Sequence, residues 1–229
     1  MRVLAAVILS IGLSSSLCFG AEKLELKDLK DTESYSLGYQ FGQSLKAQGL
    51  DFNLEVYTAA IRDALAGTKP LLSQEEMQKT VSDLQKRVTI ARQKELKEQA
   101  QKNLSEGRAF LEANKTKEGV VTLPSGLQYK ILKAGEGKKP TEADTVEVHY
   151  RGTLINGTEF DSSLGRGQPV TLKLSGVIPG WREALKLMPV GSKWQLFIPP
   201  QLAYGEKGAG KEIKPNSTLI FEVELLAIK

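Results

Sequence analysis

The feature that most limits how this chain can fold is the stretch from Ser73 to Asn114, which contains no proline and only one glycine, Gly107. Glu76 stands three residues after Ser73, and this spacing forms a capping box that starts a helix. An uninterrupted helix over this stretch would extend roughly 60 Å at 1.5 Å per residue. We therefore predict a long connecting helix over residues 73–115, with a differently organised domain on each side.

The surface of this helix changes character along its length. Its first half carries apolar residues at three- and four-residue steps, namely Met77, Val81, Leu84, Val88 and Ala91. We expect this stripe to pack on the helices that precede it. After Ala91 the helix is surrounded by glutamine, lysine and glutamate. We therefore expect the second half to be solvated, with modest support from pairs such as Glu98 and Lys102.

The segment before the long helix also shows helical periodicity, with Tyr35, Gly38, Phe41, Gly42 and Leu45 recurring at three- and four-residue steps. We expect Asp31 or Thr32 to cap the start of a first helix that ends at Gly49. A second helix is expected to open at Asn53 and to stop at Gly67.

Gly38 and Gly42 stand one helical turn apart, so that a second helix backbone could approach this face closely. This notch fits either local packing within one chain or contact with a second subunit, and the residues leave both readings open. Because short helices bury little surface alone, a unit of this size is expected to associate. We predict that residues 21–72 form a helical dimerisation domain and that the protein is a homodimer through these helices.

Residues 1–20 have the pattern of a secretory signal peptide. Arg2 supplies the positive start, and an apolar stretch follows that is too short to span a membrane. Cys18 and Gly20 place small residues three and one positions before a cut ahead of Ala21. Cleavage at this point predicts export to the periplasm.

Lipid attachment through Cys18 is the alternative, although Leu17 is bulky where lipoprotein processing prefers a small residue. Outer-membrane association therefore stays open. Cys18 is the only cysteine, so the mature chain would contain no disulfide. Absence of disulfides in an exported chain favours a bacterial periplasm.

The charge balance argues against nucleic acid as a partner. The formal net charge is +4 and falls to +3 when Arg2 leaves with the signal peptide. These charges are scattered, and no run of basic residues is interleaved with aromatic ones. We expect no nucleic-acid binding.

Residues 119–229 are predicted to form a separate domain of short strands, because turn signals recur at Pro124-Ser-Gly126, Gly135-Glu-Gly137, Asn156-Gly157 and Gly165-Arg-Gly167. Asn156-Gly157 between two short runs is a strong hairpin signal. Residues 181–187 read as a short amphipathic helix, and residues 193–198 and 218–228 read as strands. The predicted class is α+β, with a curved antiparallel sheet wrapped on one short helix.

The chemistry-bearing residues of this domain are mostly apolar: Tyr150, Phe160, Val177, Ile178, Trp181, Tyr204 and Phe221, accompanied by one carboxylate, Asp161. The only histidine, His149, alternates onto the strand face opposite Tyr150, so we find no nucleophile–base pair and no zinc site. An apolar hollow with few polar groups suits binding and distortion of an uncharged group. This combination favours rotation about proline imide bonds, a reaction for which we expect neither a metal nor a cofactor.

Four separated motifs, VEVHYRGTLINGTEFDSS, GVIPGW, IPPQLAYG and TLIFEVELLAI, resemble FKBP-type peptidyl-prolyl cis-trans isomerases. The resemblance covers residues 121–229. The whole layout, with the SYSLGYQFG stretch near the start, is similar to the dimeric Mip-like (macrophage infectivity potentiator) subgroup of Gram-negative bacteria.

The resemblance implies a pocket with Trp181 as its floor, walls of Tyr150, Phe160, Val177, Ile178, Tyr204 and Phe221, and Ile213 on a loop that covers it. Asp161, Tyr204 and Tyr150 are its implied catalytic groups. Asp161 would orient Tyr150 or stabilise the dipole of the rotating carbonyl, whereas its alternative is a turn carboxylate that binds local backbone.

The implied partners are proline-containing unfolded or partly folded polypeptides, together with the macrolide inhibitors tacrolimus and rapamycin. The chain departs from the family pattern at Val170 and Leu172, where phenylalanines are common, and at residues 208–210, where a histidine is often found. These departures bear on substrate preference and inhibitor affinity. The alternative function is that of a dimeric chaperone that holds nonnative periplasmic clients, with isomerase activity secondary.

Overall fold

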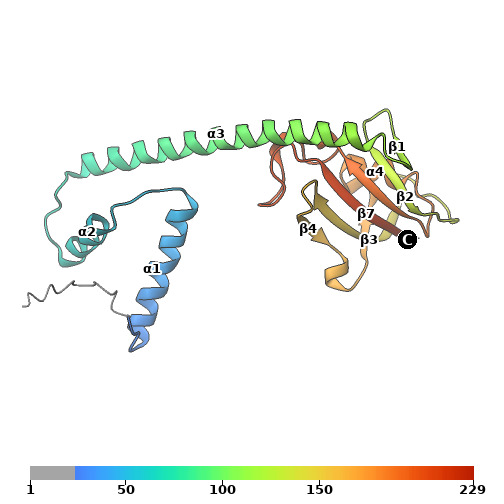
Figure 1. Ribbon diagram of the computed structural model, residues 1–229. Helices are drawn as coiled ribbons and strands as arrows, with labels where there is room; N and C mark the ends of the chain where they lie inside the picture. The colour runs from blue at the N-terminus through green and yellow to red at the C-terminus, as the bar shows by residue number, and fades with distance from the viewer. Residues whose placement is uncertain (1–23) are drawn as a thin grey trace, which may run out of the picture. The chain divides into compact units, whose positions relative to one another are not determined.

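The computed structural model describes residues 24–229, drawn in colour in Figure 1. The predicted signal peptide, residues 1–20, lies outside the described residues. The chain divides into two compact units, the first ending at Ser73 and the second spanning Gln74–Lys229. Within the described residues, no helix is both long enough and apolar enough to cross a membrane.

The first unit contains α1 (Leu29–Ala47) and α2 (Leu54–Ala66), which confirms the two predicted helices. Asn53 caps α2 by accepting hydrogen bonds from the backbone N–H groups of the first turn, and Gly67 ends it in a left-handed conformation. These are the two residues that the sequence indicated, because an asparagine start and a glycine stop satisfy the free groups at helix ends.

The predicted cap of α1 is wrong. Asp28, not Asp31 or Thr32, caps this helix, because its carboxylate accepts a 2.8 Å hydrogen bond from the Asp31 backbone N–H. Asp31 and Thr32 lie inside the first turn, where the Asp31 carboxylate accepts a 3.0 Å hydrogen bond from the Lys27 N–H and the Thr32 hydroxyl donates to the Asp28 carbonyl at 2.9 Å. Gly49, with a φ of 65°, follows the end of the helix as expected.

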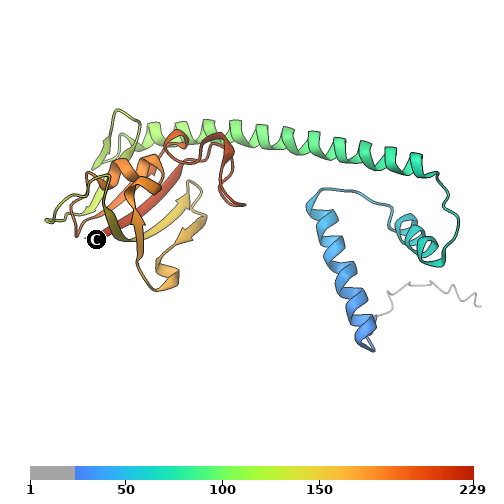
Figure 2. The ribbon, with the colours of Figure 1, turned by 180° about the vertical axis from the view of Figure 1, so that it is seen from behind.

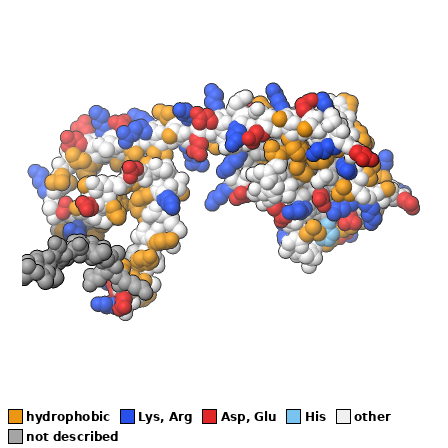
Figure 3. Space-filling model, viewed as in Figure 1, with side chains coloured by type: hydrophobic (Ala, Val, Ile, Leu, Met, Phe, Trp, Pro, Cys, Tyr) orange, Lys and Arg blue, Asp and Glu red, His pale blue; other side chains and the backbone are white. Residues whose placement is uncertain are grey.

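The second unit begins with α3 (Gln74–Asn114), whose 41 residues confirm the predicted long helix. Figure 3 shows its lysine, arginine, aspartate and glutamate side chains interspersed along the surface. The pairs formed within its second half are Lys94–Glu98 at 3.9 Å and Lys102–Glu106 at 4.0 Å, not the expected pair of Glu98 with Lys102. Each is a solvent-exposed pair that contributes little to stability.

The last turns of α3 pack on the sheet, so the prediction that its whole second half is solvated is wrong. The Asn114 side chain is buried and donates a 2.9 Å hydrogen bond to Gln128, whose own amide donates to the Leu111 carbonyl at 2.9 Å. The Phe110 ring lies 6.0 Å from that of Phe197. These contacts explain why helical residues with a polar sequence pattern are nevertheless partly covered.

The described residues form one antiparallel sheet of seven strands, visible from both sides in Figures 1 and 2. The strands are β1 (Val120–Thr122), β2 (Gln128–Lys133), β3 (Thr145–Leu154), β4 (Glu159–Ser162), β5 (Val170–Lys173), β6 (Lys193–Ile198) and β7 (Leu219–Ile228). Their order is β1-β2-β6-β7-β3-β4, and β5 also pairs with β3. The α+β class with a curved antiparallel sheet is therefore confirmed.

The β3–β4 hairpin forms at the predicted Asn156-Gly157 turn. Gly157 has a φ of 86°, which a residue with a side chain rarely adopts. Leu154 and Thr158 close the turn with a 2.9 Å backbone hydrogen bond. This hairpin brings β4 beside β3 and sets Gly152 opposite Asp161.

The helices α3 and α4 (Pro179–Leu185) cover opposite faces of the sheet. Phe197 faces α3, whereas the adjacent Ile198 faces α4, because successive strand side chains point to opposite faces. Gly180 permits the close approach, since a Cβ there would lie 2.5 Å from Ile198 Cγ2. The core on the α4 side includes Leu185 and also Trp194, which stacks on a tyrosine and is structural, as the sequence indicated.

Candidate active site

A cavity of about 520 Å³ opens between the β3–β4 hairpin, β5, α4 and the loop before β7. All nine residues that the sequence singled out lie in its lining: Tyr150, Phe160, Asp161, Val177, Ile178, Trp181, Tyr204, Ile213 and Phe221. They come from separate elements between residues 150 and 221, so only the fold brings them together.

The floor of the cavity is a cluster of aromatic rings packed edge to face. The Trp181 ring lies 5.2 Å from those of Tyr150 and Phe221, at 85° to each. Phe160 meets Phe221 at 5.4 Å and 84°. Because edge-to-face rings interact favourably and have few rotamers, this cluster forms a rigid apolar surface. Trp181 is 4% exposed, and its indole nitrogen has no hydrogen-bond partner among the described residues.

Gly152 and Pro179 help to place these rings at the cavity. Gly152 lies beneath Phe160 and Phe221, and a Cβ on it would come within 2.7 Å of both rings. Pro179 occupies the first turn of α4, where a proline needs no hydrogen-bond donor, and it directs the chain from Ile178 into the helix that carries Trp181. The Ile178 N–H, at the N-cap position, stands just outside the helical hydrogen bonding.

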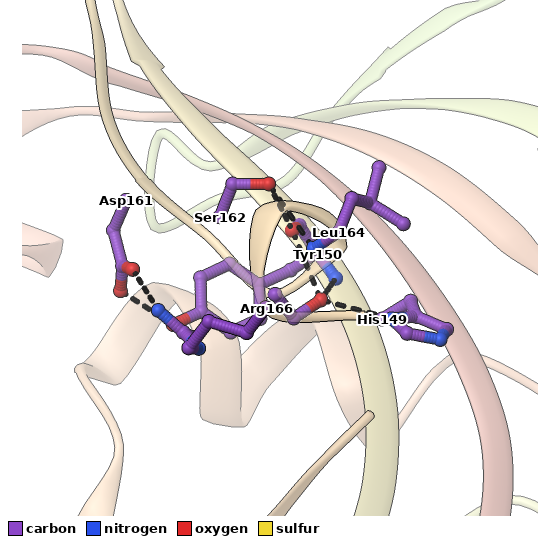
Figure 4. Close-up of polar contacts among 7 residues, drawn as sticks. His149, Tyr150, Asp161, Ser162, Leu164 and Arg166 are labelled. Atoms are coloured by element: carbon purple, nitrogen blue, oxygen red, sulfur yellow. Dashed lines mark hydrogen bonds and ion pairs between the residues drawn. The ribbon is translucent and has the colours of Figure 1, made fainter. Parts of the chain in front are cut away.

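The polar groups at the cavity edge form a closed triangle, shown in Figure 4. The Tyr150 hydroxyl donates to Asp161 Oδ2. Arg166, from the 3₁₀ helix η1 (Leu164–Arg166), donates to Asp161 Oδ1 at 2.8 Å and to the Tyr150 hydroxyl at 2.9 Å. Each of the three side chains therefore contacts the other two.

The contacts within this triangle shift the pKa values of Asp161 and Tyr150. Burial alone raises the pKa of Asp161, but the hydrogen bonds from Tyr150 and Arg166 outweigh it, and the net effect lowers the pKa of this carboxyl. Burial, followed by the hydrogen bond to Asp161, raises the pKa of Tyr150. Asp161 is consequently an anion and Tyr150 a neutral donor near neutral pH.

The backbone of Tyr150 is held by Ser163, the residue that follows β4. The Ser163 hydroxyl is fully buried, accepts a 2.8 Å hydrogen bond from the Tyr150 N–H and lies 3.0 Å from His149 Nδ1. Figure 4 shows His149 on the side away from the Asp161 carboxylate. His149 does not line the cavity, as its strand alternation indicated.

Two family models match the chain. Residues 136–226 match the FKBP-type peptidyl-prolyl cis-trans isomerase model, and residues 30–131 match the domain amino terminal to FKBP-type peptidyl-prolyl isomerase. The chain belongs to the FKBP-type peptidyl-prolyl cis-trans isomerase family. It is an enzyme that accelerates rotation about the bonds preceding proline, and its substrates are proline-containing chains.

Relatives of this isomerase span nearly its whole length. The outer membrane protein MIP of Legionella longbeachae is 44% identical over 229 residues, covering 100% of this chain and 98% of the relative. The FKBP-type 22 kDa isomerase of Escherichia coli K12 is 48% identical over 196 residues, which are 85% of this chain and 93% of the relative. The crystal structure of FkpA from Escherichia coli superposes with a TM-score of 0.71 at 40% identity, covering 90% and 99% of the two chains. These relatives favour isomerisation over the alternative of a chaperone with secondary activity.

The sequence did not indicate every functional side chain near the cavity: Arg166 contacts Asp161 at the cavity edge without belonging to the lining. Arg166 was noted only as the centre of a Gly-Arg-Gly turn, and its position five residues after Asp161 was the available signal. The lining residues that were not predicted as site residues are Gly176, Ala209, Gly210, Lys211 and Glu212. Leu172, one of the two departures from the family pattern on β5, lines the cavity, whereas Val170 does not.

No metal site accompanies the cavity in the part of the chain that the structure describes: residues 24–229 contain no group of three or more His, Cys, Asp or Glu side chains placed to hold an ion. The lining offers aromatic rings, branched apolar side chains and the Asp161 triangle. Such a surface is suited to binding an uncharged ring and holding nearby carbonyl groups.

Proposed function

We propose that the isomerase binds an X-Pro segment in this cavity, with the proline ring on Trp181 and the preceding carbonyl near the Asp161 triangle. The main observation that supports this proposal is that all nine residues predicted for the pocket line one cavity, and that the floor of this cavity is aromatic. Phe160, Val177 and Phe221 exclude solvent from the bound segment, and Ile213 covers it.

The physical basis of the rate enhancement is the difference in polarity between planar and twisted amides. Rotation requires loss of amide resonance, with a barrier of roughly 18–20 kcal/mol. The twisted carbon–nitrogen unit is less polar than the planar one, so a dry apolar cavity stabilises it relative to water. Each tenfold gain in rate requires about 1.4 kcal/mol of such preference for the transition state. No covalent step is needed.

Tyr204 is the proposed hydrogen-bond donor to a substrate carbonyl. Its hydroxyl has no hydrogen-bond partner among the described residues, and the side chain is 41% exposed at the cavity. Tyr150 differs, because its proton is already donated to Asp161. We therefore assign Tyr150 and Asp161 an electrostatic role toward the rotating carbonyl, and Tyr204 together with the Ile178 N–H the role of holding the substrate backbone.

The test is a coupled assay on a short Ala-Leu-Pro peptide with the full chain. We expect Tyr204→Phe and Asp161→Asn each to lower kcat/KM, whereas Tyr129→Phe, which removes a hydroxyl outside the cavity lining, should retain wild-type activity. Wild-type turnover with unchanged rates in both cavity variants would refute the assigned roles. A wild-type rate equal to that in buffer would refute the proposed use of the cavity itself.

Macrolide binding is the finer partner proposal. Tacrolimus and rapamycin carry a proline-like ring next to carbonyl groups, so we expect them to occupy the Trp181 floor and to quench its fluorescence. Leu172 lines the cavity at a position where phenylalanine is common in the family, so we predict macrolide binding but no value for its affinity. Adding rapamycin to the wild type and to Trp181→Phe, and following tryptophan fluorescence, would test this proposal. Quenching is expected in the wild type and not in the variant.

The helical domain is proposed to dimerise. No residue of α1 or α2 is buried. Within the first unit no atom lies within 4 Å of a Cβ built at Gly38 or Gly42, so α2 does not cover this face. A second copy is the proposed occupant, which supports the subunit-contact reading of the glycine notch. A monomer in sedimentation at micromolar concentration would contradict it.

The proposed location is the periplasm. Association with the outer membrane depends on whether the mature amino terminus carries a lipid, which can be measured directly. A relative that matches the whole chain is named an outer membrane protein. Folding of exported polypeptides is the corresponding proposed role. Mass spectrometry of the mature amino terminus would distinguish cleavage before Ala21 from lipid attachment at Cys18.

A further inference from the structure

One side of the cavity is closed by the segment Ala209–Ser217, which we call the cover segment. Its first residues, Ala209 to Ile213, line the cavity. Ala209 and Ile213 exchange backbone hydrogen bonds of 2.8 and 3.1 Å, so the tip of the segment is closed by its own contacts. Ile213 is only 8% exposed. The residues that follow Ile213 attach this tip to the rest of the domain on one side.

Those following residues are held by α3. Asn103 Nδ2 donates a 2.7 Å hydrogen bond to the Pro215 carbonyl and lies 3.4 Å from Ser217 Oγ. Gln99 Nε2 donates to Asn103 Oδ1 at 2.7 Å, which turns the Asn103 amide nitrogen toward Pro215. Figures 1 and 2 agree in placing the loop before β7 directly against α3. The Asn103 amide is thus the shortest hydrogen-bond contact of the helix with the cover segment.

Asn216 shows that the cover segment is held in a specific conformation. Its φ of 57° is the only left-handed value among the described residues other than glycine. Its backbone N–H donates to the Gly205 carbonyl at 2.8 Å, and its side chain reaches the Ala100 carbonyl on α3 at 3.5 Å. A left-handed asparagine is less favourable than an ordinary backbone conformation, so these contacts hold it in place.

Pro215 is connected to the cavity residue Ile213 by a short and conformationally restricted stretch of backbone. Only Lys214 separates Pro215 from Ile213, and the residue before a proline has restricted backbone angles. The proline ring fixes its own φ. The short link between Pro215 and Ile213 therefore has few free backbone torsions to absorb a shift of the Pro215 carbonyl.

We infer that Asn103 on α3 is a positioning residue for the isomerase: it fixes Pro215 and thereby keeps Ile213 over the cavity. This inference rests on the proposed function of that cavity. It gives the long helix a direct effect on substrate binding, through a residue that does not itself line the cavity. If the cover segment spends part of its time displaced, the apparent affinity for substrate falls in proportion.

The decisive variant is Asn103→Ala in the full chain, because alanine preserves the helix while removing the amide. We expect KM for an X-Pro peptide to rise by up to about fivefold, the limit set by the loss of one ordinary hydrogen bond, with kcat nearly unchanged. Hydrogen exchange should accelerate at the amides of Ala209, Ile213 and Asn216, which the present contacts protect. The amide of Val223 in β7 should keep its wild-type protection.

Two further variants separate positioning from a general effect on the helix. Gln101→Ala alters an exposed α3 residue two positions away and should leave both readouts unchanged. Asn103→Asp keeps the size of the side chain but turns an acceptor toward the Pro215 carbonyl, so its effects should equal or exceed those of Asn103→Ala.

The inference is overturned if Asn103→Ala has wild-type KM and wild-type exchange at the three amides. It is also overturned if KM changes only together with a uniform rise in exchange that includes Val223, because that result would indicate general destabilisation. An inactive wild type would instead refute the proposed function. In that case the exchange at Ala209, Ile213 and Asn216 would still decide whether Asn103 positions the segment.

Discussion

Arg166 Nη1 lies 2.8 Å from Asp161 Oδ1, and the same guanidinium donates to the Tyr150 hydroxyl that itself donates to Asp161. The arginine therefore stabilises the anionic carboxylate and saturates one lone pair of the tyrosine. Its guanidinium carbon also lies 5.8 Å from the centre of the Tyr150 ring. Three residues from β3, β4 and η1 act as one electrostatic unit at the cavity edge.

The first prediction concerns stability in acid. The pKa of Asp161 in the folded chain lies below its ordinary value of 3.8, so the carboxylate binds protons less readily than in the unfolded chain. Its stabilising contribution is present above the unfolded pKa and is lost as pH falls through the folded pKa. We expect the free energy of unfolding to fall more steeply below about pH 4 in the wild type than in Asp161→Asn. Denaturant titrations at several pH values measure this difference.

The control for this experiment is Asp83→Asn, which also removes one carboxylate but lies on the exposed surface of α3 and outside the cavity lining. Its pH profile should follow that of the wild type. Parallel profiles for the wild type and Asp161→Asn would show that the triangle does not stabilise the carboxylate.

The second prediction removes the arginine. Arg166→Met deletes both hydrogen bonds and leaves the Tyr150–Asp161 contact in place. Because burial now acts on Asp161 without the compensating cation, the pKa of this carboxyl should rise. We expect the acid limb of kcat/KM to move to higher pH, with a decrease of about tenfold or less at neutral pH, equivalent to at most about 1.4 kcal/mol. Arg166→Lys keeps a positive charge near Asp161 and should therefore move the acid limb less than Arg166→Met does. An unshifted acid limb in Arg166→Met would contradict the prediction.

The third prediction uses the two tryptophans as a matched pair, since each is 4% exposed. Trp181→Phe removes part of the cavity floor, and we expect kcat/KM to fall about tenfold, or about 1.4 kcal/mol. Trp194 stacks on Tyr129 at 4.3 Å outside the cavity. Trp194→Phe should therefore lower stability by about 1–2 kcal/mol, less than truncation to alanine would, while keeping activity. Equal losses of activity in both variants would indicate that the floor has no special role.

Much of the local structure was predictable because nearby residues determine it. The Asn156-Gly157 turn and the caps of α2 depend on backbone preferences within a few residues. The nine cavity residues were reached through separated motifs that resemble a known family, since spacing alone does not show that Tyr150 and Phe221 converge. Local patterns thus predicted the elements, and family resemblance predicted the residues of the candidate site.

The remaining features depend on contacts between distant parts of the chain. Asn103 reaches Pro215, 112 residues later, and nothing in the polar pattern of α3 distinguishes it from its solvated neighbours. The mutual contact of Arg166 and Asp161 depends on the geometry of η1, which no periodicity describes. Gly107 is different: a single glycine in a long helix is unfavourable by itself and could have indicated a close approach.

The fourth prediction concerns Gly152, which lies beneath two rings of the cavity. A Cβ on Gly152 would come within 2.7 Å of Phe160 and Phe221, so Gly152→Ala must displace at least one ring. Overpacking of this kind costs about 1–3 kcal/mol, and the displaced ring should raise KM as well. Gly165→Ala is the control, because a Cβ there would meet no atom within 4 Å. Chemical denaturation and the peptide assay together test this, and a stable, fully active Gly152→Ala would contradict it.

The fifth prediction concerns the close approach of α3 to the sheet at Gly107. In a helix interior, replacement of glycine by alanine ordinarily stabilises by about 1 kcal/mol. At Gly107 a Cβ would lie 2.3 Å from Thr218 Oγ1, so we expect Gly107→Ala to destabilise by about 1–3 kcal/mol instead. Thr218 Oγ1 is buried and has no hydrogen-bond partner among the described residues, so Thr218→Ala breaks no such bond.

The double variant Gly107→Ala/Thr218→Ala should therefore recover most of the stability that Gly107→Ala loses, because the nearest clashing atom is gone. Unfolding in denaturant, followed by tryptophan fluorescence, gives the four free energies of the cycle. A coupling energy of about 1 kcal/mol or more is the expected result for two residues in direct contact. Additivity within about 0.5 kcal/mol would show that α3 relaxes away from Thr218, and the close packing of this helix against the residue before β7 would then be weaker than its geometry implies.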